Sequence, residues 1–272
     1  MATQDKRAEV AGGHFLDEWS PAELHRYLDR AASSKRRMLH RLGLLSLEDQ
    51  NVLDAGCGPG TFGTILAETN RVVGIDISRR SVVVATRRAR EAGASFVGLV
   101  GDLELLPFPD GTFDVCFCGW VLHHFSDVGP MVHELKRVLK PDGVLALVEP
   151  NEANIAMRFS RFLEDRFQKM VLAASLDTPN RNVHSHAYYA AVLCKHGFRD
   201  VKFNSCYSGE VPDLPCSKKR KLGSWGTSAV RLLLAARHLL FMLSERVLPK
   251  PLNGAGLLIT ARRSGGNDSR AP

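Results

Sequence analysis

Short apolar runs alternate with longer amphipathic stretches along the first half of the chain. The short runs are apolar almost throughout, which is typical of strands that are buried on both faces of a sheet. The longer stretches repeat their apolar positions at helical spacing, so each predicts a helix between two strands. This alternation predicts a parallel sheet covered by helices on both faces. The runs that predict strands are NVLDAG (51–56), RVVGIDIS (71–78), SFVGLVGD (95–102), FDVCFCGW (113–120) and VLALVE (144–149).

Capping and turn residues indicate where the helices begin and end. Gly93 ends one helical stretch, and Ser126 with Asp127 opens another. The sequence KPDG at 140–143 has the turn chemistry that closes this second helix before the next strand. Helices are predicted over 21–42, 61–69, 78–93, 126–139 and 185–198.

The alternation is interrupted after Glu149 by two inserts, and each of them has a helical pattern. Two further strands are predicted beyond the first insert, at 200–205 and 256–263. The predicted organisation is an N-terminal helical segment at 1–45, a core at 46–150 and a C-terminal part at 151–272, with inserts at about 151–184 and 206–254.

The second insert contains a helix with a wide apolar surface, at 228–248. Charged residues interrupt it too often for a segment that spans a membrane. Three interpretations remain open: a helix packed against the domain, a lid over an apolar substrate, or a helix lying on a membrane. The basic run SKKRK at 217–221 lies just before it. The polar positions of the helix are Arg231, Arg237, His238, Ser244 and Glu245.

A glycine-rich loop follows the first predicted strand, in the sequence NVLDAGCGPGTFGTIL at 51–66. Gly58, Gly60 and Gly63 satisfy the spacing G-x-G-x-x-G, which by itself is weak evidence for a dinucleotide site. Asp54 at the end of the strand argues against a pyrophosphate, because like charges repel. A ligand ammonium group would be attracted to the same carboxylate.

An aspartate stands at or just past the end of each of the first three strands, namely Asp54, Asp76 and Asp102. Ligands of open α/β sheets bind at the carboxyl edge, where these strand ends meet. Asp76 follows Asp54 at the spacing of a carboxylate that binds both ribose hydroxyls. Three acids at this edge favour a neutral or cationic nucleoside over a dinucleotide diphosphate.

The successive motifs VLDAGCGPG, VVGIDIS, GDLELLPFPDGTFDVCFCGWVLHHF and LKPDGVLALVEP resemble those of class I, seven-strand S-adenosylmethionine-dependent methyltransferases. The resemblance covers roughly 50–150 and is strongest to the branch that modifies ubiquinone and other small molecules. It implies a doubly wound α/β fold with a mostly parallel seven-stranded sheet, in which 256–263 is an antiparallel last strand.

The resemblance also implies a binding site for S-adenosylmethionine. The loop from Gly56 to Gly60 would face the methionine part, with Asp54 near its amino group. Asp76 would bind the ribose, and Asp102 with Leu103 would contact the adenine. The strand end from Cys118 to Trp120 would line the sulfonium. The complete set of cofactor-binding candidates is Asp54, Ala55, Gly56, Cys57, Gly58, Gly60, Asp76, Ile77, Asp102, Leu103, Cys118, Gly119 and Trp120.

Methyl transfer to a hydroxyl group requires a base that removes its proton. His123, His124 and Glu149 are the candidates, because they follow strands that end at the expected active edge. A purely structural role remains open for each of them. Candidates for substrate contact are His14, Phe15, Trp19, His184, His186 and Tyr188.

The charge and the cysteine pattern bear on the partners, the metal content and the cellular location of the protein. The formal net charge is +7, but the basic residues are scattered, and no nucleic-acid-binding module is evident. The cysteines lack metal-ligand spacing and no secretory segment opens the chain, so a cytoplasmic protein without a metal is expected. Contact with a membrane surface or a lipid-like substrate through 217–248 remains an alternative.

The favoured function is O-methylation of a small apolar or amphiphilic acceptor, such as a natural product, an isoprenoid or a lipid-linked molecule. Nitrogen and carbon remain open as the methylated atom. A methyltransferase acting on RNA or protein is the main alternative. A non-catalytic cofactor-binding protein and a nicotinamide oxidoreductase are further alternatives.

Overall fold

A computed structural model describes residues 20–151, 154, 184–206 and 256–265, together with positions 228, 232, 235, 236, 239 and 243. Its centre is a seven-stranded sheet with the order β3-β2-β1-β4-β5-β7-β6. Only β7 runs antiparallel to its neighbours within this sheet, which confirms the predicted fold class. The strands are β1 (Asn51–Ala55), β2 (Arg71–Asp76), β3 (Phe96–Val100), β4 (Phe113–Gly119), β5 (Leu139–Pro150), β6 (Phe198–Cys206) and β7 (Gly256–Arg263).

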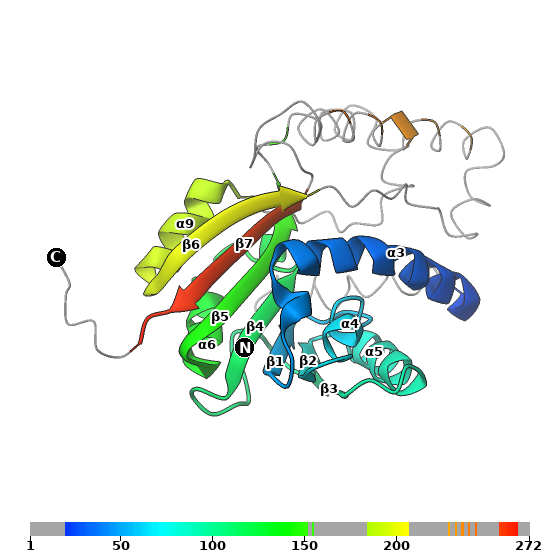
Figure 1. Cartoon of the computed structure of the whole chain (residues 1–272), viewed down its shortest axis with the longest axis horizontal. Helices are drawn as coiled ribbons and strands as arrows, with labels where there is room; N and C mark the ends of the chain where they lie inside the picture. The colour runs from blue at the N-terminus through cyan, green and yellow to red at the C-terminus, as the bar shows by residue number, and fades with distance from the viewer. Residues whose placement is uncertain are drawn as a thin grey trace.

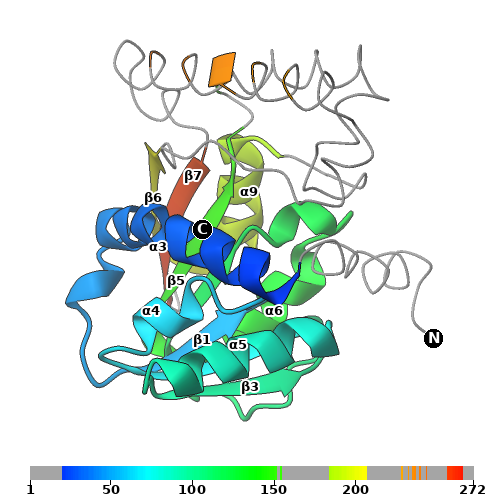
Figure 2. The same cartoon turned by 90° about the vertical axis from the view of Figure 1, so that its right-hand side faces the viewer.

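Helices cover both faces of the sheet (Figure 1). Figures 1 and 2 show α3 and α4 on one face, whereas α6 and α9 lie on the other. The helices are α3 (Pro21–Arg41), α4 (Gly63–Leu66), α5 (Arg79–Glu91), α6 (Gly129–Val138) and α9 (His186–Lys195), with short 3₁₀ helices η1 (Leu44–Ser46) and η2 (Leu122–His124).

Two hydrophobic clusters fill the spaces between the sheet and its helices. Strand β4 contributes to both, because its side chains alternate between the faces of the sheet. Cys116 and Cys118 pack in the cluster that contains α6 and α9, and Val115 and Phe117 pack in the cluster that contains α3 and α4. Cys116 and Cys118 therefore share one face of the sheet.

Local capping explains why several predicted helix ends agree with the structure. The Ser78 hydroxyl accepts a hydrogen bond from the backbone N–H of Ser81 at the start of α5, and Gly93 beyond its end has a φ of 64°. The Ser185 hydroxyl caps α9 in the same way, by accepting from the N–H of Tyr188. These residues mark both ends of α5 and the start of α9, whereas α9 ends at Lys195, before the predicted end at residue 198.

Strand β5 begins earlier than the apolar pattern predicts. It starts at Leu139 and includes the KPDG sequence that was expected to be a turn. Asp142 has a φ of 62°, and the register with β4 shifts between Phe113 and Val115. A strand with such an irregularity accommodates the extra residues of the turn sequence.

Helices α4 and α6 are shorter than expected. Helix α4 covers only Gly63–Leu66 of the predicted 61–69. Helix α6 begins at Gly129, because Asp127 accepts a hydrogen bond from the Gly129 N–H at 2.8 Å and so remains in the preceding turn.

Most of the two inserts lies outside the described residues. In the second, Ser228, Leu232, Ala235, Ala236, Leu239 and Leu243 are helical and exposed. Leu232 is 73% exposed and Leu239 is 56% exposed, so the described part of this helix presents an apolar side to solvent. Within the described residues, no helix is long and apolar enough to cross a membrane.

Candidate functional site

The candidate site lies where the carboxyl ends of the parallel strands meet. Strands β1, β2 and β3 end next to Asp54, Asp76 and Asp102, as the sequence predicts. Strands β4 and β5 end at the same edge, next to Trp120 and Glu149. The parallel arrangement thus places all five strand ends along one edge of the sheet.

The glycine loop after β1 is held against the second strand and lies directly beside the loop after β4. The backbone N–H groups of Gly56 and Cys57 donate to the Ile75 carbonyl at 2.8 and 3.1 Å. Gly56 has a φ of +74°, and a Cβ atom built on it would lie 2.4 Å from Val121 Cγ2. A left-handed backbone and a close neighbour therefore both require glycine at this position.

Asp54 is a buried carboxyl group with one unsatisfied oxygen. It is 1% exposed, and its Oδ2 accepts no hydrogen bond of normal geometry from the described residues. This oxygen lies beside Gly63, whose backbone N–H partly opposes the increase in pKa caused by burial. Burial, reinforced by the nearby charge of Asp76, raises the pKa of Asp54 to about 7. A cation beside this oxygen would restore the ionised form and offset the cost of burying the charge.

Asp76 holds the glycine loop by its side chain. Its Oδ2 accepts from the Gly58 N–H at 2.9 Å, and its Oδ1 accepts from the Ser78 N–H at 2.8 Å. Burial raises the pKa of Asp76, and these two hydrogen bonds oppose that increase. Each carboxylate oxygen can accept more than one hydrogen bond, so Asp76 retains acceptor capacity for a ligand.

Asp102 and Leu103 lie just past the end of β3. The Asp102 side chain accepts from the Glu104 N–H at 3.0 Å and is partly exposed, whereas Leu103 is buried. Asp54, Asp76 and Asp102 are thus carried by neighbouring strands of the sheet, as expected. Of the other predicted cofactor residues, Ala55, Cys57, Gly60 and Cys118 are buried, whereas Ile77, Gly58 and Gly119 are partly exposed.

Trp120 ends β4 in an unusual backbone conformation. Its φ is +63°, a region that non-glycine residues rarely occupy outside functional or tightly constrained positions. Its backbone N–H donates to the Val148 carbonyl at 2.7 Å. Its indole N–H is buried without an acceptor among the described residues.

Lys35 of α3 is a site neighbour that the sequence did not predict. Its ammonium nitrogen lies 5.4 Å from the ring centre of Trp120 and 5.0 Å from that of Phe62. Both distances are typical of a cation–π contact. No sequence signal separates Lys35 from the other basic residues of this helix, because only the tertiary fold brings it to the end of β4.

Glu149 and His123 bind each other in the interior. Glu149 is fully buried, and its Oε2 lies 2.8 Å from His123 Nδ1. Oε1 accepts from the N–H groups of Val121 and Leu122 at 3.0 and 2.8 Å, and Oε2 accepts from that of His123 at 3.3 Å. The His124 ring is partly exposed and lies 4.1 Å from the His123 ring, measured between ring centres.

Three of the predicted substrate contacts lie at the beginning of α9. Because α9 precedes β6, and β6 runs parallel to β5, the start of this helix lies at the same edge of the sheet. His184 stacks on Tyr188 with 3.9 Å between ring centres, and the ring of His186 lies 5.9 Å from that of Phe203. The other three predicted contacts, His14, Phe15 and Trp19, lie outside the described residues.

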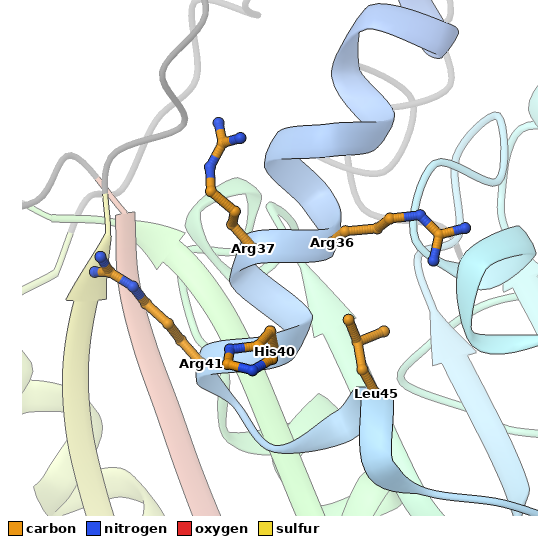
Figure 3. A pocket seen from close by; sticks show the side chains of 5 residues that line it. All are labelled: Arg36, Arg37, His40, Arg41 and Leu45. Carbon is orange, nitrogen blue, oxygen red and sulfur yellow. The ribbon is translucent and has the colours of Figure 1, made fainter.

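A separate shallow pocket lies on the last turns of α3 and on η1 (Figure 3). Its lining residues are Arg36, Arg37, His40, Arg41 and Leu45. Arg36 is paired with Glu68, and Arg41 donates to the Ser205 carbonyl at 2.6 Å. Figure 3 shows the three guanidinium groups pointing away from one another, and none of the lining residues belongs to the glycine loop. This pocket is distinct from the candidate site.

Within the part of the chain that the structure describes, no group of three or more His, Cys, Asp or Glu residues could hold a metal ion.

Part of the chain is similar to known methyltransferases. Residues 53–147 match the family described as "Methyltransferase domain". An uncharacterized methyltransferase of Bacillus subtilis is 43% identical over 103 residues, which cover 37% of this chain and 41% of that protein. A demethylmenaquinone methyltransferase of Listeria welshimeri is 36% identical over 110 residues, covering 39% of this chain and 47% of that protein. The chain thus spans less than half the length of these curated relatives.

A solved structure of a methyltransferase from Thermotoga maritima shares the fold. It aligns with a TM-score of 0.60, covering 93% of this chain and 100% of that one, at 16% sequence identity. At this identity the likeness concerns the fold. Together with the family match, it confirms the predicted resemblance to class I methyltransferases for the segment 53–147.

Proposed function

We propose that the chain transfers the methyl group of S-adenosylmethionine to a small-molecule acceptor, since residues 53–147 match the family described as "Methyltransferase domain". The observation that carries this proposal is the unsatisfied oxygen of buried Asp54, which lies at the end of β1 just before a glycine loop. A ligand that combines an ammonium group with an uncharged nucleoside suits this environment better than a dinucleotide.

The residues of the site fit the parts of this cofactor. Asp54 would pair with the ammonium group, and the Gly56–Gly60 loop would approach the methionine backbone closely. Asp76 would accept hydrogen bonds from the ribose, and Asp102 with Leu103 would border the adenine. When bound, the cofactor would supply a methyl group on a positively charged sulfur. This sulfur would leave as a neutral thioether, which is a good leaving group.

The chain itself has to orient the acceptor and remove a proton where the acceptor is a hydroxyl. Glu149 has both carboxylate oxygens engaged in the interior, so this placement favours a positioning role over proton removal. We propose His124 as the base, because its ring is partly exposed at the end of β4. O-methylation is the reaction that such a base serves.

We also propose that the acceptor is apolar or amphiphilic. Two observations support this: one relative bears the name demethylmenaquinone methyltransferase, and the described leucines of 228–243 are exposed. The same leucines support contact with a lipid-like acceptor through this segment. Incubating the protein with labelled cofactor and a panel of quinols, phenols and prenyl diphosphates would identify the acceptor class by transfer of the label.

Ligand-induced thermal stabilisation tests the proposal directly. S-adenosylhomocysteine at a hundred times its Kd should stabilise the native state by about 2.7 kcal/mol and raise Tm, because it binds only the folded protein. NAD(H) at the same concentration should leave Tm unchanged. Stabilisation by NAD(H) and not by S-adenosylhomocysteine would instead support the oxidoreductase alternative.

A further inference from the structure

The carboxylate of Glu149 forms hydrogen bonds with successive residues of the segment that follows β4. Three successive backbone N–H groups, those of Val121, Leu122 and His123, point to its two oxygens. The fourth hydrogen bond joins Oε2 to the Nδ1 atom of the His123 ring, as the 2.8 Å separation shows. A buried charge is tolerated when several donors satisfy it, and here every donor comes from one short stretch.

The same stretch forms one wall of the glycine loop. Val121 occupies the space in which a side chain of Gly56 would lie, at 2.4 Å from its would-be Cβ. On the other side of Val121, Trp120 adopts its left-handed backbone and is bonded to Val148, the residue before Glu149. The end of β5 therefore holds the segment 120–123 at both ends, and this segment touches the cofactor loop.

We propose that Glu149 is a positioning residue that sets the cofactor affinity of the glycine loop through Val121. The hydrogen bonds to its two oxygens hold the segment 121–123 in place. The side chain of Val121 then holds the backbone of Gly56 in position. The same bonds hold the His123 ring against His124, the proposed base. This inference rests on the proposed cofactor, and it assigns to Glu149 a function that does not require contact with any ligand.

A carboxylate suits this position better than an amide of the same shape. Each oxygen of Glu149 accepts two hydrogen bonds, so all four donors are satisfied. In Glu149→Gln the amide nitrogen would face at least one N–H donor, because an amide has a single accepting oxygen. The segment 121–123 should therefore shift, and Val121 should shift with it.

A double-mutant cycle on S-adenosylhomocysteine binding tests this coupling. The variants are Glu149→Gln, Val121→Ala and both together, with Kd measured by calorimetry. We expect Glu149→Gln to weaken binding about tenfold in the wild-type background and less than threefold in the Val121→Ala background. Equal weakening in both backgrounds would overturn the inference.

Two further variants separate positioning from general loss of stability. Leu145→Ala removes a fully buried side chain from the same strand, away from the segment 121–123, and should lower Tm without changing Kd. If Glu149→Gln does not fold, Glu149→Asp replaces it in the cycle, because the shorter side chain keeps the charge but withdraws both oxygens from the backbone N–H groups of 121–123. A wild-type protein that does not bind S-adenosylhomocysteine would overturn the proposed function and this inference together, whereas additive effects would overturn the inference alone.

Discussion

The carboxyl group of Asp54 is buried, so its ionisation costs free energy. Because burial raises its pKa to about 7, the unliganded protein holds a proton on this group below that pH. An ammonium ligand requires the ionised carboxylate, so binding below pH 7 has to release the proton. The proposed cofactor should therefore bind more weakly as the pH falls.

Calorimetry of S-adenosylhomocysteine binding measures this dependence. Between pH 7 and pH 5.5 we expect the affinity of the wild-type protein to fall about tenfold, with proton uptake by the buffer. Asp54→Asn should bind weakly at both pH values and show no such release. A wild-type affinity that is constant over this range would show that Asp54 does not pair with the ligand.

The same residue should limit the stability of the unliganded protein. The pKa of Asp54 is higher in the folded state than its ordinary value of 3.8, so the folded state binds the proton more tightly. Its contribution to stability is therefore largest near pH 4 and is lost as the pH rises through 7. At pH 8, Asp54→Asn should raise the free energy of unfolding by about 2 kcal/mol or more, measured in urea.

Gly56 differs from Gly43, another left-handed glycine, because a side chain at Gly56 would meet a close neighbour. Gly56→Ala combines backbone strain with a collision against Val121. Gly43 has a φ of +75°, but a Cβ atom built on it would have no neighbour within 4 Å, so Gly43→Ala adds backbone strain alone. We expect Gly56→Ala to cost about 3 kcal/mol and to abolish cofactor binding, and Gly43→Ala to cost about 1 kcal/mol with binding retained. Equal effects of the two substitutions on Kd would contradict the close packing described for Gly56.

At the scale of elements, α3 connects the N-terminal part of the described chain to the sheet. Its Met38 and Leu39 are almost completely buried in the cluster that contains α4 and Phe117. We expect Leu39→Ala to lower the free energy of unfolding by about 2–5 kcal/mol. Ser33→Ala, at an exposed position of the same helix, should change it by less than about 0.5 kcal/mol.

Elements with capping residues were the most predictable from the sequence. Ser78 and Gly93 mark the two ends of α5 and Ser185 marks the start of α9, so these three helix ends agree with expectation. The start of β5 was not predictable, because KPDG has the same turn chemistry whether a helix ends there or a strand bends. Only the pairing with β4 decides between the two.

In the candidate site too, some positions are predictable from the local sequence and others depend on the tertiary fold. The positions of Asp54, Asp76 and Asp102 follow from strand ends, which the apolar pattern reveals. The pairing of Glu149 with His123 is not predictable from the sequence, because the contact depends on how the segments after β4 and at the end of β5 meet. Lys35 lies outside every motif, and only the packing of α3 places it beside Trp120.

At the scale of the whole molecule, β7 connects β6 to the five parallel strands β1 to β5. Ile259 pairs with Leu147 of β5 on one side and with Phe203 of β6 on the other. Ile259→Pro removes a backbone donor from this central strand and should prevent stable folding, whereas Ile259→Val should cost about 1 kcal/mol. Circular dichroism with urea unfolding compares the two, and a folded proline variant of near wild-type stability would contradict the central position of β7.

The position of β7 also sets an order of events during synthesis on the ribosome. Within the described sheet, β6 has a single strand neighbour, and that neighbour is the last strand to be translated. Until residues 256–263 emerge, β6 lacks its strand neighbour in the described sheet, and the edge of β5 that pairs with β7 stays open. The nascent chain therefore carries two unpaired edges for the whole time needed to translate 207–255, and such edges are the ones that chaperones protect from aggregation.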